Sequence, residues 1–512
     1  MTLGAGTAHY STLLEELTKR FGSEKVITDY EDLYVYSFFG PFGIQRRQTP
    51  IVVLRLDSES QIEDARRLVK DWGIQVSKSD DPWERFRNAE SETPLLLIDS
   101  RKPINRVNLR KRLSELKEAE KERKLGLKNA LSFSHWFTTL LKMGEGYRIS
   151  ESPDLDYGFC MVQHSFDGAE TFSAKGRLLL SRGLLREELR VTKKLIDSLY
   201  SCTTCGQCYD QLRHIGLEVH NAIARARHRV IKEGMGPKQF SALSNNVLVN
   251  GNPFGMPTAD RTLWFEELAD EFPFKGNDLL YWTGCSTAYR LPNIVKSTVN
   301  VLEKVDVDFG LLGNHERCCG LVLYLLGLWD EARKNALETS EMLSELGVKA
   351  LVTSCAGCYY AFTRIYPMLG VQLLLEVRHT SQFIESLILG DRLEPKGIRG
   401  RYVWHDPCDL GRHCKIYEEP RNVLRAIPEI ELKETPLNRE HTLCCGAGGG
   451  LWVFNGELTE KMALSKLSEE IMPTGIDGVV TGCPSCILNL KYAAKALGLS
   501  LIHISEPTRQ AE

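Results

Sequence analysis

The sequence has little net charge, no long apolar run and no cysteine before residue 160. The formal net charge is −3, from 64 basic and 67 acidic residues among 512, so we expect no overall field that would hold a nucleic-acid partner. No segment reaches the roughly 18 apolar residues of a membrane span, and the first residues lack the basic-then-apolar pattern of a signal peptide. We therefore expect a cytoplasmic multidomain protein, with peripheral attachment to a membrane as the alternative location.

Cysteine, in contrast, is plentiful in the rest of the chain. Of the fifteen cysteines, Cys160 is the first, and the other fourteen lie between Cys202 and Cys486. In a cytoplasmic chain of this length, reduced thiols are expected to bind metals or to take part in redox chemistry. The cysteines therefore predict where the functional part of the molecule lies.

The first 145 residues predict alternating helices and strands. Apolar residues at helical spacing predict a helix over Leu13–Phe21, and a β-branched run predicts a strand over Pro50–Leu56. Ser58 and Gln61 have the spacing of a capping box, ahead of a helix that continues to Trp72.

The segment from Leu13 to Val76 resembles the start of the FAD-binding domain of glycolate-oxidase-type flavoproteins, in which such a unit leads into a glycine-rich loop over the flavin diphosphate. Here residues 77–82 follow, and they contain no glycine and two carboxylates, which would repel a diphosphate. We therefore expect an α+β remnant that packs or docks and binds no flavin.

The end of this region is rich in charge. Residues 101–128 carry many Lys, Arg and Glu side chains, and residues 127–143 carry large apolar side chains at helical spacing. Such a pair of helices could lie on a membrane surface. We favour a solvated helix followed by a core helix, which is the more common cause of this pattern.

From residue 279 onward the chain repeats a set of five cysteines. In each copy a single cysteine precedes a Cys-Cys-Gly motif, which precedes a Cys-x-x-Cys pair. The first set is Cys285, Cys318, Cys319, Cys355 and Cys358, and the second is Cys408, Cys444, Cys445, Cys483 and Cys486. The intervals match: 32 and 35 residues before the doublet, then 35 and 37 residues before the pair. Core thiols have no physical reason to recur twice at matched spacing, so we expect the sets to be ligands.

Each copy is predicted to be a small α/β unit. Apolar runs at Leu279–Trp282 and Tyr402–Trp404 predict strands that end just before the single cysteines, where α/β folds place their sites. Residues 347–354 and 475–482 each predict a helix-ending glycine and a buried strand before a cysteine pair. Further helices are expected over Pro292–Glu303 and Glu331–Leu346.

Thiolates are soft ligands that suit iron–sulfur clusters, zinc or copper. A structural zinc site takes four ligands, commonly as two Cys-x-x-Cys pairs, so five thiols with an adjacent doublet exceed its needs. A zinc-stabilised scaffold is the alternative from a different functional class.

With these motifs the sequence resembles the CCG-domain iron–sulfur oxidoreductases, among them the catalytic subunit of heterodisulfide reductase and the iron–sulfur subunits of glycolate, lactate and anaerobic glycerol-3-phosphate oxidation systems. The resemblance extends over about residues 150–505. It implies that each five-cysteine set holds a noncubane [4Fe-4S] cluster and that the ten cysteines form a catalytic pair of sites for a disulfide. We expect Gly446, Gly448 and Gly449 to let backbone amides approach the cofactor or an anion, with a tight turn as the alternative.

A third cysteine motif lies upstream of the repeat. Cys202, Cys205 and Cys208 are spaced as Cys-x2-Cys-x2-Cys, which supplies three ligands of a bacterial-ferredoxin [4Fe-4S] cubane. The fourth cysteine of that motif should be residue 212, which is Leu212. The fourth ligand must therefore come from elsewhere.

Residues 154–164 resemble a second, decayed copy of this motif. Its four ligand positions are Asp154, Tyr157, Cys160 and His164. In two-cluster ferredoxins the fourth ligand of each motif binds the other cluster, so we expect His164 to complete the cubane. Cys160 is the alternative fourth ligand. Cys414 has no counterpart in the first set, and we expect it to be a core thiol.

We thus expect a multidomain α/β and α+β protein with four domains. They are a flavoprotein-like remnant (1–145), a helical ferredoxin-like domain (146–278) and two CCG domains (279–395 and 396–512). The resemblance implies an iron–sulfur oxidoreductase subunit with one cubane and two noncubane [4Fe-4S] clusters. It would move electrons between a flavoprotein partner and a disulfide or membrane carrier, since no flavin is expected in this chain. The alternative is a pure relay subunit of a glycolate or lactate dehydrogenase.

Overall fold

The computed structural model describes residues 10–36, 38–39, 44–45, 50–72, 74–78, 95–99, 160, 162, 170–208 and 219–506. The chain divides into two compact units, Met1–Ser198 and Leu199–Glu512. The helices expected within residues 101–143 lie outside the described residues, as do Asp154, Tyr157, His164 and Leu212.

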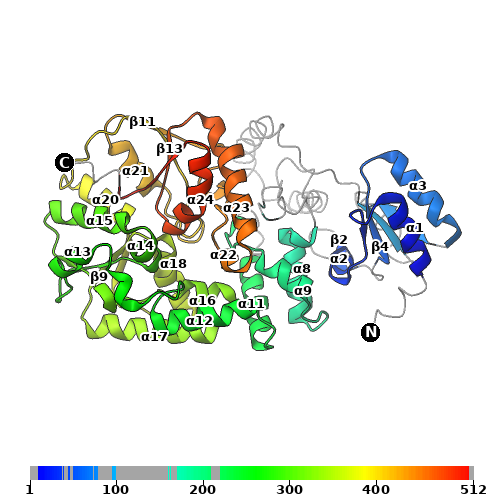
Figure 1. Ribbon diagram of the computed structural model, residues 1–512, viewed down its shortest axis with the longest axis horizontal. Helices are drawn as coiled ribbons and strands as arrows, with labels where there is room; N and C mark the ends of the chain where they lie inside the picture. The colour runs from blue at the N-terminus through cyan, green and yellow to red at the C-terminus, as the bar shows by residue number, and fades with distance from the viewer. Residues whose placement is uncertain are drawn as a thin grey trace, which may run out of the picture. The chain divides into compact units, whose positions relative to one another are not determined.

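The first unit contains a four-stranded mixed sheet in the order β1-β4-β6-β5. Its strands are β1 (Val26–Ile27), β4 (Val52–Arg55), β5 (Gln75–Lys78) and β6 (Leu95–Asp99). β1 pairs with β4 antiparallel, and the other pairs are parallel. Helices α1 (Ser11–Phe21) and α3 (Glu59–Val69) share a buried apolar core with this sheet (Figure 1). The predicted helix–strand–helix order is confirmed.

The start of α3 shows why the sequence pattern was informative. The Ser58 hydroxyl accepts a hydrogen bond from the backbone N–H of Gln61, which satisfies one of the unpaired donors of the first helical turn. Ser77 and Lys78, expected in a loop, belong instead to β5, and Ser77 is buried. The sheet and helices form a mixed α/β arrangement here, and kinship with flavin-binding domains stays a prediction.

Among the residues that the structure describes, this part of the chain also contains further helices and short strands. They are α2 (Tyr30–Tyr36), β2 (Phe38–Phe39), β3 (Ile44–Gln45), α8 (Ala174–Leu185) and α9 (Lys193–Tyr200).

The second unit contains two parallel four-stranded sheets of the same topology (Figure 1). The first has the order β10-β9-β7-β8, from β7 (Leu279–Trp282), β8 (Phe309–Gly310), β9 (Ala350–Thr353) and β10 (Glu376–His379). The second has the order β12-β11-β13-β14, from β11 (Gly400–Trp404), β12 (Ile430–Lys433), β13 (Gly478–Thr481) and β14 (Ser500–His503). In chain order both read 2-1-3-4. The connections diverge between strands 1 and 3, which is the topological switch point of an α/β sheet.

The expected strands and helices of the repeat are confirmed with small shifts at their ends. The helices expected over Pro292–Glu303 and Glu331–Leu346 are α15 (Pro292–Lys304) and α17 (Trp329–Glu345). Gly347 and Gly475 both have a φ of 66°, the left-handed conformation expected of a glycine that ends a helix. The remaining α-helices of the second unit are α11 (Val219–Lys232), α12 (Lys238–Asn250), α13 (Glu266–Glu271), α14 (Cys285–Arg290), α16 (Leu321–Leu326), α18 (Ala356–Tyr360), α19 (Tyr366–Met368), α20 (Thr380–Leu389), α21 (Glu418–Ala426), α22 (Leu451–Phe454), α23 (Gly456–Ser465) and α24 (Pro484–Ala496).

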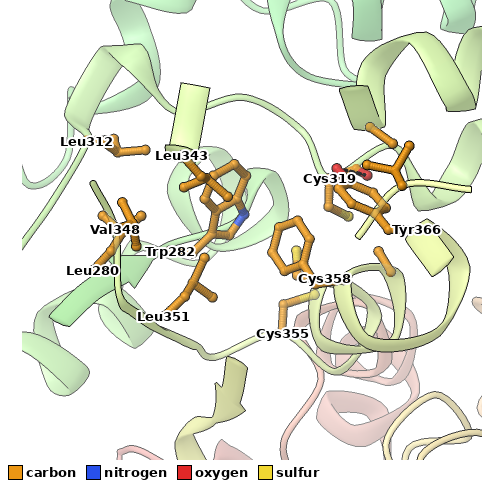
Figure 2. Close-up of a cluster of buried hydrophobic side chains, with 14 residues drawn as sticks. Leu280, Trp282, Leu312, Cys319, Leu343, Val348, Leu351, Cys355, Cys358 and Tyr366 are labelled. Atoms are coloured by element: carbon orange, nitrogen blue, oxygen red, sulfur yellow. Dashed lines mark hydrogen bonds between the residues drawn. The ribbon is translucent and has the colours of Figure 1, made fainter. Parts of the chain in front are cut away.

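The core of the first sheet merges with its cysteines. Trp282, at the end of β7, belongs to the same buried cluster as Cys319, Cys355 and Cys358. Figure 2 shows Trp282 between the aliphatic side chains of the sheet and the three thiols. The strand ends therefore place the cysteines inside the protein rather than on its surface. Among the described residues, no helix is long and apolar enough to cross a membrane.

Candidate iron–sulfur site

The cysteines of each set lie after the carboxyl ends of strands 1 and 3, and the doublet lies in the segment that follows strand 2. Cys285 begins α14 directly after β7, and Cys355 is the N-cap of α18 directly after β9. Gly284, between β7 and Cys285, has a φ of 80°, and a Cβ there would lie 3.3 Å from Cys358 Sγ. A side chain at this position would press on the thiol pair, which explains the glycine.

The five thiols of the first set form one continuous series of contacts. Cys285 Sγ lies 3.9 Å from Cys318 Sγ. Cys318 contacts Cys319, which contacts Cys358, and Cys358 contacts Cys355. The order of contact is therefore the single cysteine, the doublet, and then the pair.

The second set repeats this order. Cys408 contacts Cys444, and Cys444 contacts Cys445. Cys445 Sγ lies 3.2 Å from Cys486 Sγ, and Cys486 contacts Cys483. The repeat in the sequence therefore corresponds to two sets of thiols with the same order of contacts.

The two sets meet at their cysteine pairs. Cys355 of the first set contacts Cys483 of the second. The backbone N–H of Ala356 donates to the carbonyl oxygen of Gly482 (3.3 Å). His379, at the end of β10, donates from Nε2 to the same carbonyl oxygen (2.9 Å). The ten predicted site cysteines therefore form one site with two halves.

The ferredoxin-like segment lies against the second half. Cys205 contacts Cys444. Arg412 donates from Nε to the carbonyl oxygen of Cys205 (2.6 Å), and His413 donates from Nε2 to the carbonyl oxygen of Thr204 (2.9 Å). The loop with the three ferredoxin-type cysteines is therefore held by residues that closely follow Cys408.

A buried arginine fixes the same loop from the other side. Arg227, on α11, is fully buried and donates to the carbonyl oxygens of Cys202 (2.6 Å), Leu199 (2.7 Å), Leu325 (2.7 Å) and Gly449 (2.9 Å). Hydrogen bonds from a charged donor are the stronger kind, and four carbonyl partners keep the guanidinium satisfied without a carboxylate. Arg227 also adds positive charge beside a site built from thiolates.

The predicted glycines have two different roles. The Gly446 amide donates to Cys444 Sγ (3.4 Å), as the Gly320 amide does to Cys318 Sγ in the first copy (3.4 Å). Gly448 and Gly449 pack instead on the ferredoxin-like loop, where added Cβ atoms would lie 2.6 Å from Thr203 O and 2.4 Å from Cys202 O. They permit a close approach between two backbones.

Contacts among the thiols favour the thiolate form at selected positions. Hydrogen bonds from Cys318 and Cys358 lower the pKa of Cys319 to about 6. Hydrogen bonds from Cys444 and Cys486 hold the pKa of Cys445, the equivalent residue, well below its usual range. The thiolate is the form that binds metals, so the second cysteine of each doublet is prepared for ligation.

Buried carboxylates hold the strand ends in place. In the first copy Glu316 pairs with Arg261 and accepts hydrogen bonds from the amides of Thr283 (2.7 Å) and Gly284 (2.8 Å), just before Cys285. In the second copy Asp406 pairs with Arg421 (2.7 Å), two residues before Cys408. Buried pairs of this kind define local geometry more than they add stability.

Asp409 is a half-buried acid between the two halves. Its carboxylate lies beside Gly357, where an added Cβ would be 3.5 Å from Oδ2. Burial, followed by the charges of Cys483 and Cys444, raises the pKa of Asp409 to about 8. Nothing in the sequence pattern marks this residue except its position next to Cys408.

Two other cysteines stand apart from the thiol series. Burial raises the pKa of Cys414 to about 12, and its Sγ lies 3.7 Å from Thr363 Oγ1, which fits the expected core thiol. Cys160 lies 3.7 Å from Arg177 Nη1 within the first unit. His164 lies outside the described residues, so the fourth ferredoxin-type ligand stays a prediction.

The donor set fits iron–sulfur chemistry. Each half offers five sulfurs in contact, with a backbone amide directed at one sulfur in each, and hydrogen bonds to sulfur are among the features that tune cluster sites. A tetrahedral zinc ion would leave one thiol of each set without a role. The residues present are therefore sufficient for clusters in both halves.

Comparison with known proteins agrees with this geometry. The model of the CCG family, described as a cysteine-rich domain, matches residues 279–363 and 402–491. A subunit of the dihydromethanophenazine:CoB–CoM heterodisulfide reductase of Methanosarcina barkeri is 32% identical over 343 residues, covering 65% of this chain and 81% of that protein. The corresponding subunit of Methanosarcina acetivorans is 31% identical over 330 residues, covering 63% and 78%. An EtfAB:quinone oxidoreductase of Syntrophomonas wolfei is 28% identical, covering 59% and 44%.

Proposed function

The chain belongs to the CCG cysteine-rich family, together with this heterodisulfide reductase subunit, and on this premise we propose that it is a disulfide-reducing subunit with three iron–sulfur clusters. The observation that carries the proposal is the single series of contacts through both five-cysteine sets, joined at Cys355 and Cys483. A site with two adjoining halves suits a substrate with two adjoining sulfurs. The relatives of this chain are oxidoreductases, and this chain is one.

The proposed ligands are the residues predicted from the sequence. Each five-cysteine set would hold one noncubane [4Fe-4S] cluster, and Cys202, Cys205 and Cys208 with His164 would hold a cubane. When bound, these groups would supply one-electron transfer and a site for disulfide sulfur. Gly446 and Gly320 would stabilise the ligand thiolates through their amides.

The arrangement of the protein suggests which set receives electrons first. The second set contacts the ferredoxin-like loop through Cys205 and Cys444. Arg227, Arg412 and His413 hold that contact by hydrogen bonds to the loop backbone. We assign the second set as the half that adjoins the cubane and the first set as the terminal half.

The proposal also divides the chain into domains and assigns a role to the first of them. The four domains keep the predicted boundaries at residues 145, 278 and 395, with residues 1–145 as a docking remnant of a flavin-binding domain. Because this chain would bind no flavin, a flavoprotein partner would convert two-electron to one-electron transfer. The site is proposed to work in the cytoplasm or at the membrane surface.

The second candidate function is a relay that passes electrons to a membrane carrier. It is favoured by the similarity to the EtfAB:quinone oxidoreductase, whose name includes a quinone. A relay needs the same clusters but no access for a disulfide.

One experiment separates the two functions. The chain is reduced with dithionite, freed of excess reductant and mixed with the CoB–CoM heterodisulfide or a set of small symmetrical disulfides, and released thiol is measured. A disulfide reductase consumes two electrons and two protons for each pair of thiols released, and the double variant Cys318→Ala/Cys319→Ala abolishes the release. If a reduced protein with full iron content releases no thiol but reduces an added quinone, the proposal is contradicted and the relay is favoured.

A further inference from the structure

One difference between the two halves of the site lies at the end of strand 1. Three residues before the single cysteine, the first copy has Trp282 and the second has His405. Trp282 lies opposite Thr353 in the sheet. His405 occupies the equivalent register, since its amide donates to Val480 O (2.8 Å) and its carbonyl accepts from Thr481 Oγ1 (3.1 Å).

His405 is buried, and neither of its ring nitrogens has a hydrogen-bond partner among the described residues. Other fully buried histidines of this unit are paired. His379 bonds to Ser381 and Gly482, and His503 bonds to Ser505 and Ser354. An unsatisfied buried polar atom destabilises the folded protein, so a partner supplied with the cofactor would explain a histidine at this position.

The ring faces the sulfurs of the second set. One ring nitrogen of His405 and the Sγ atoms of Cys445 and Cys486 all lie within 4.8 Å of one another. These two cysteines are the equivalents of Cys319 and Cys358, which share a buried cluster with Trp282 in the first copy (Figure 2). The position three residues before the single cysteine therefore carries a buried ring in both halves, in one cluster with these cysteines in the first copy and close to their equivalents in the second.

His405 is not needed as an iron ligand. The first copy provides the same five thiols with a tryptophan at this position, and an indole does not ligate iron. The five thiols of the second copy are therefore a complete ligand set, and the ring can act through its N–H group. Hydrogen bonds to cluster sulfurs raise the reduction potential, because they stabilise the more negative reduced form.

We propose that His405 donates a ring N–H hydrogen bond to a sulfur of the cluster in the second half, and that this bond raises the potential of the half that adjoins the cubane. The inference rests on the proposed function, because it needs a cluster in the second set. His405 is a positioning and tuning residue and does not contact the reacting disulfide in this account.

The test uses the full chain with the first half disabled by Cys318→Ala/Cys319→Ala, so that the second cluster is observed beside the cubane alone. In this background the midpoint potential of the second cluster is measured by a redox titration that is monitored by EPR. Three proteins are compared: the one that keeps His405, and the variants His405→Leu and His405→Gln. We expect the potential to fall in His405→Leu, to be restored at least in part by the amide N–H of His405→Gln, and iron content and the cubane signal to stay unchanged. In protein with ¹⁵N-labelled histidine, the second cluster should show a weak ¹⁵N coupling that is lost in His405→Leu.

Each other outcome has a defined meaning. An unchanged potential in His405→Leu overturns the inference while the three-cluster proposal stands. Loss of iron from the second set in a folded His405→Leu protein also overturns it, since it would make His405 a ligand. If the parent with an intact second set lacks that cluster altogether, the proposed function itself fails.

Discussion

His379 of the first sheet donates a hydrogen bond from Nε2 to the carbonyl oxygen of Gly482, the residue before Cys483 of the second set (2.9 Å). The backbone N–H of Ser381 donates to the other ring nitrogen, Nδ1 (3.2 Å), which places the ring proton on Nε2. One side chain thus caps α20 in the first copy and holds the ligand turn of the second. The two halves are joined by a neutral, fully buried hydrogen bond as well as by the contact between Cys355 and Cys483.

Removing this ring should loosen the turn that carries Cys483. In His379→Leu the carbonyl of Gly482 keeps the amide of Ala356 (3.3 Å) but loses its closer donor. The free energy of unfolding of the iron-free chain should therefore fall by about 0.5–1.5 kcal/mol, the net value of one hydrogen bond. His379→Gln, which keeps an N–H donor, should lose less. Denaturant unfolding of the three proteins measures this. Equal stability of the leucine variant and the wild type would show that this hydrogen bond does not stabilise the fold.

The same histidine predicts a pH dependence. Burial lowers the pKa of His379 from 6.5 to about 4, so between these values the unfolded chain binds a proton that the folded chain does not. Stability linked to this group is therefore complete above pH 6.5 and is lost as the pH falls toward 4, by a total of about 3 kcal/mol. The difference between the unfolding free energies of wild type and His379→Gln, measured from pH 4 to pH 7.5, should shrink in that direction. A difference that is constant with pH would contradict the assignment.

The fourth ligand of the cubane is open to a direct test. We expect His164→Ala to shift the potential and the EPR spectrum of the cubane and to weaken its binding, because an imidazole is replaced by a methyl group. The matched control is Cys160→Ala, which should leave both unchanged. If Cys160→Ala disturbs the cubane and His164→Ala does not, the cross-ligation rule of two-cluster ferredoxins does not hold in this chain.

We expect the isolated chain to bind no flavin. Residues 77–82 lack the glycines with which a backbone approaches a diphosphate, and two carboxylates there would repel it. Isothermal titration with FAD, and the flavin content of the purified protein, should both give values near zero. Stoichiometric FAD would indicate that residues 1–145 form a flavin-binding domain, and a flavoprotein partner would then not be needed.

Local pattern predicted much of the second unit. Five-cysteine spacing, apolar runs before Cys285 and Cys408, and glycines at 347 and 475 are short-range signals, and each corresponds to an observed strand, cap or ligand loop. These signals work because a buried parallel strand must be apolar and a helix-ending residue in the left-handed region favours glycine.

The contacts between segments that are distant in the sequence could not be predicted from local pattern. Cys205 and Cys444 are far apart in sequence, and no spacing rule indicates that they touch. Arg227, which binds four backbone carbonyls from three separate segments of the chain, is an ordinary basic residue of an amphipathic helix when only the sequence is considered. His405 was also missed, although aligning the two copies on Cys285 and Cys408 sets it against Trp282 and would have marked it.

The most direct test of the central claim is the iron and acid-labile sulfide content of the anaerobically purified chain. Three clusters of four irons predict about twelve irons per chain, and about eight in Cys318→Ala/Cys319→Ala or in Cys444→Ala/Cys445→Ala, with the cubane EPR signal kept in both variants. About four irons in the wild type, or zinc in place of iron with no visible band that dithionite bleaches, would contradict the assignment of clusters to the two five-cysteine sets.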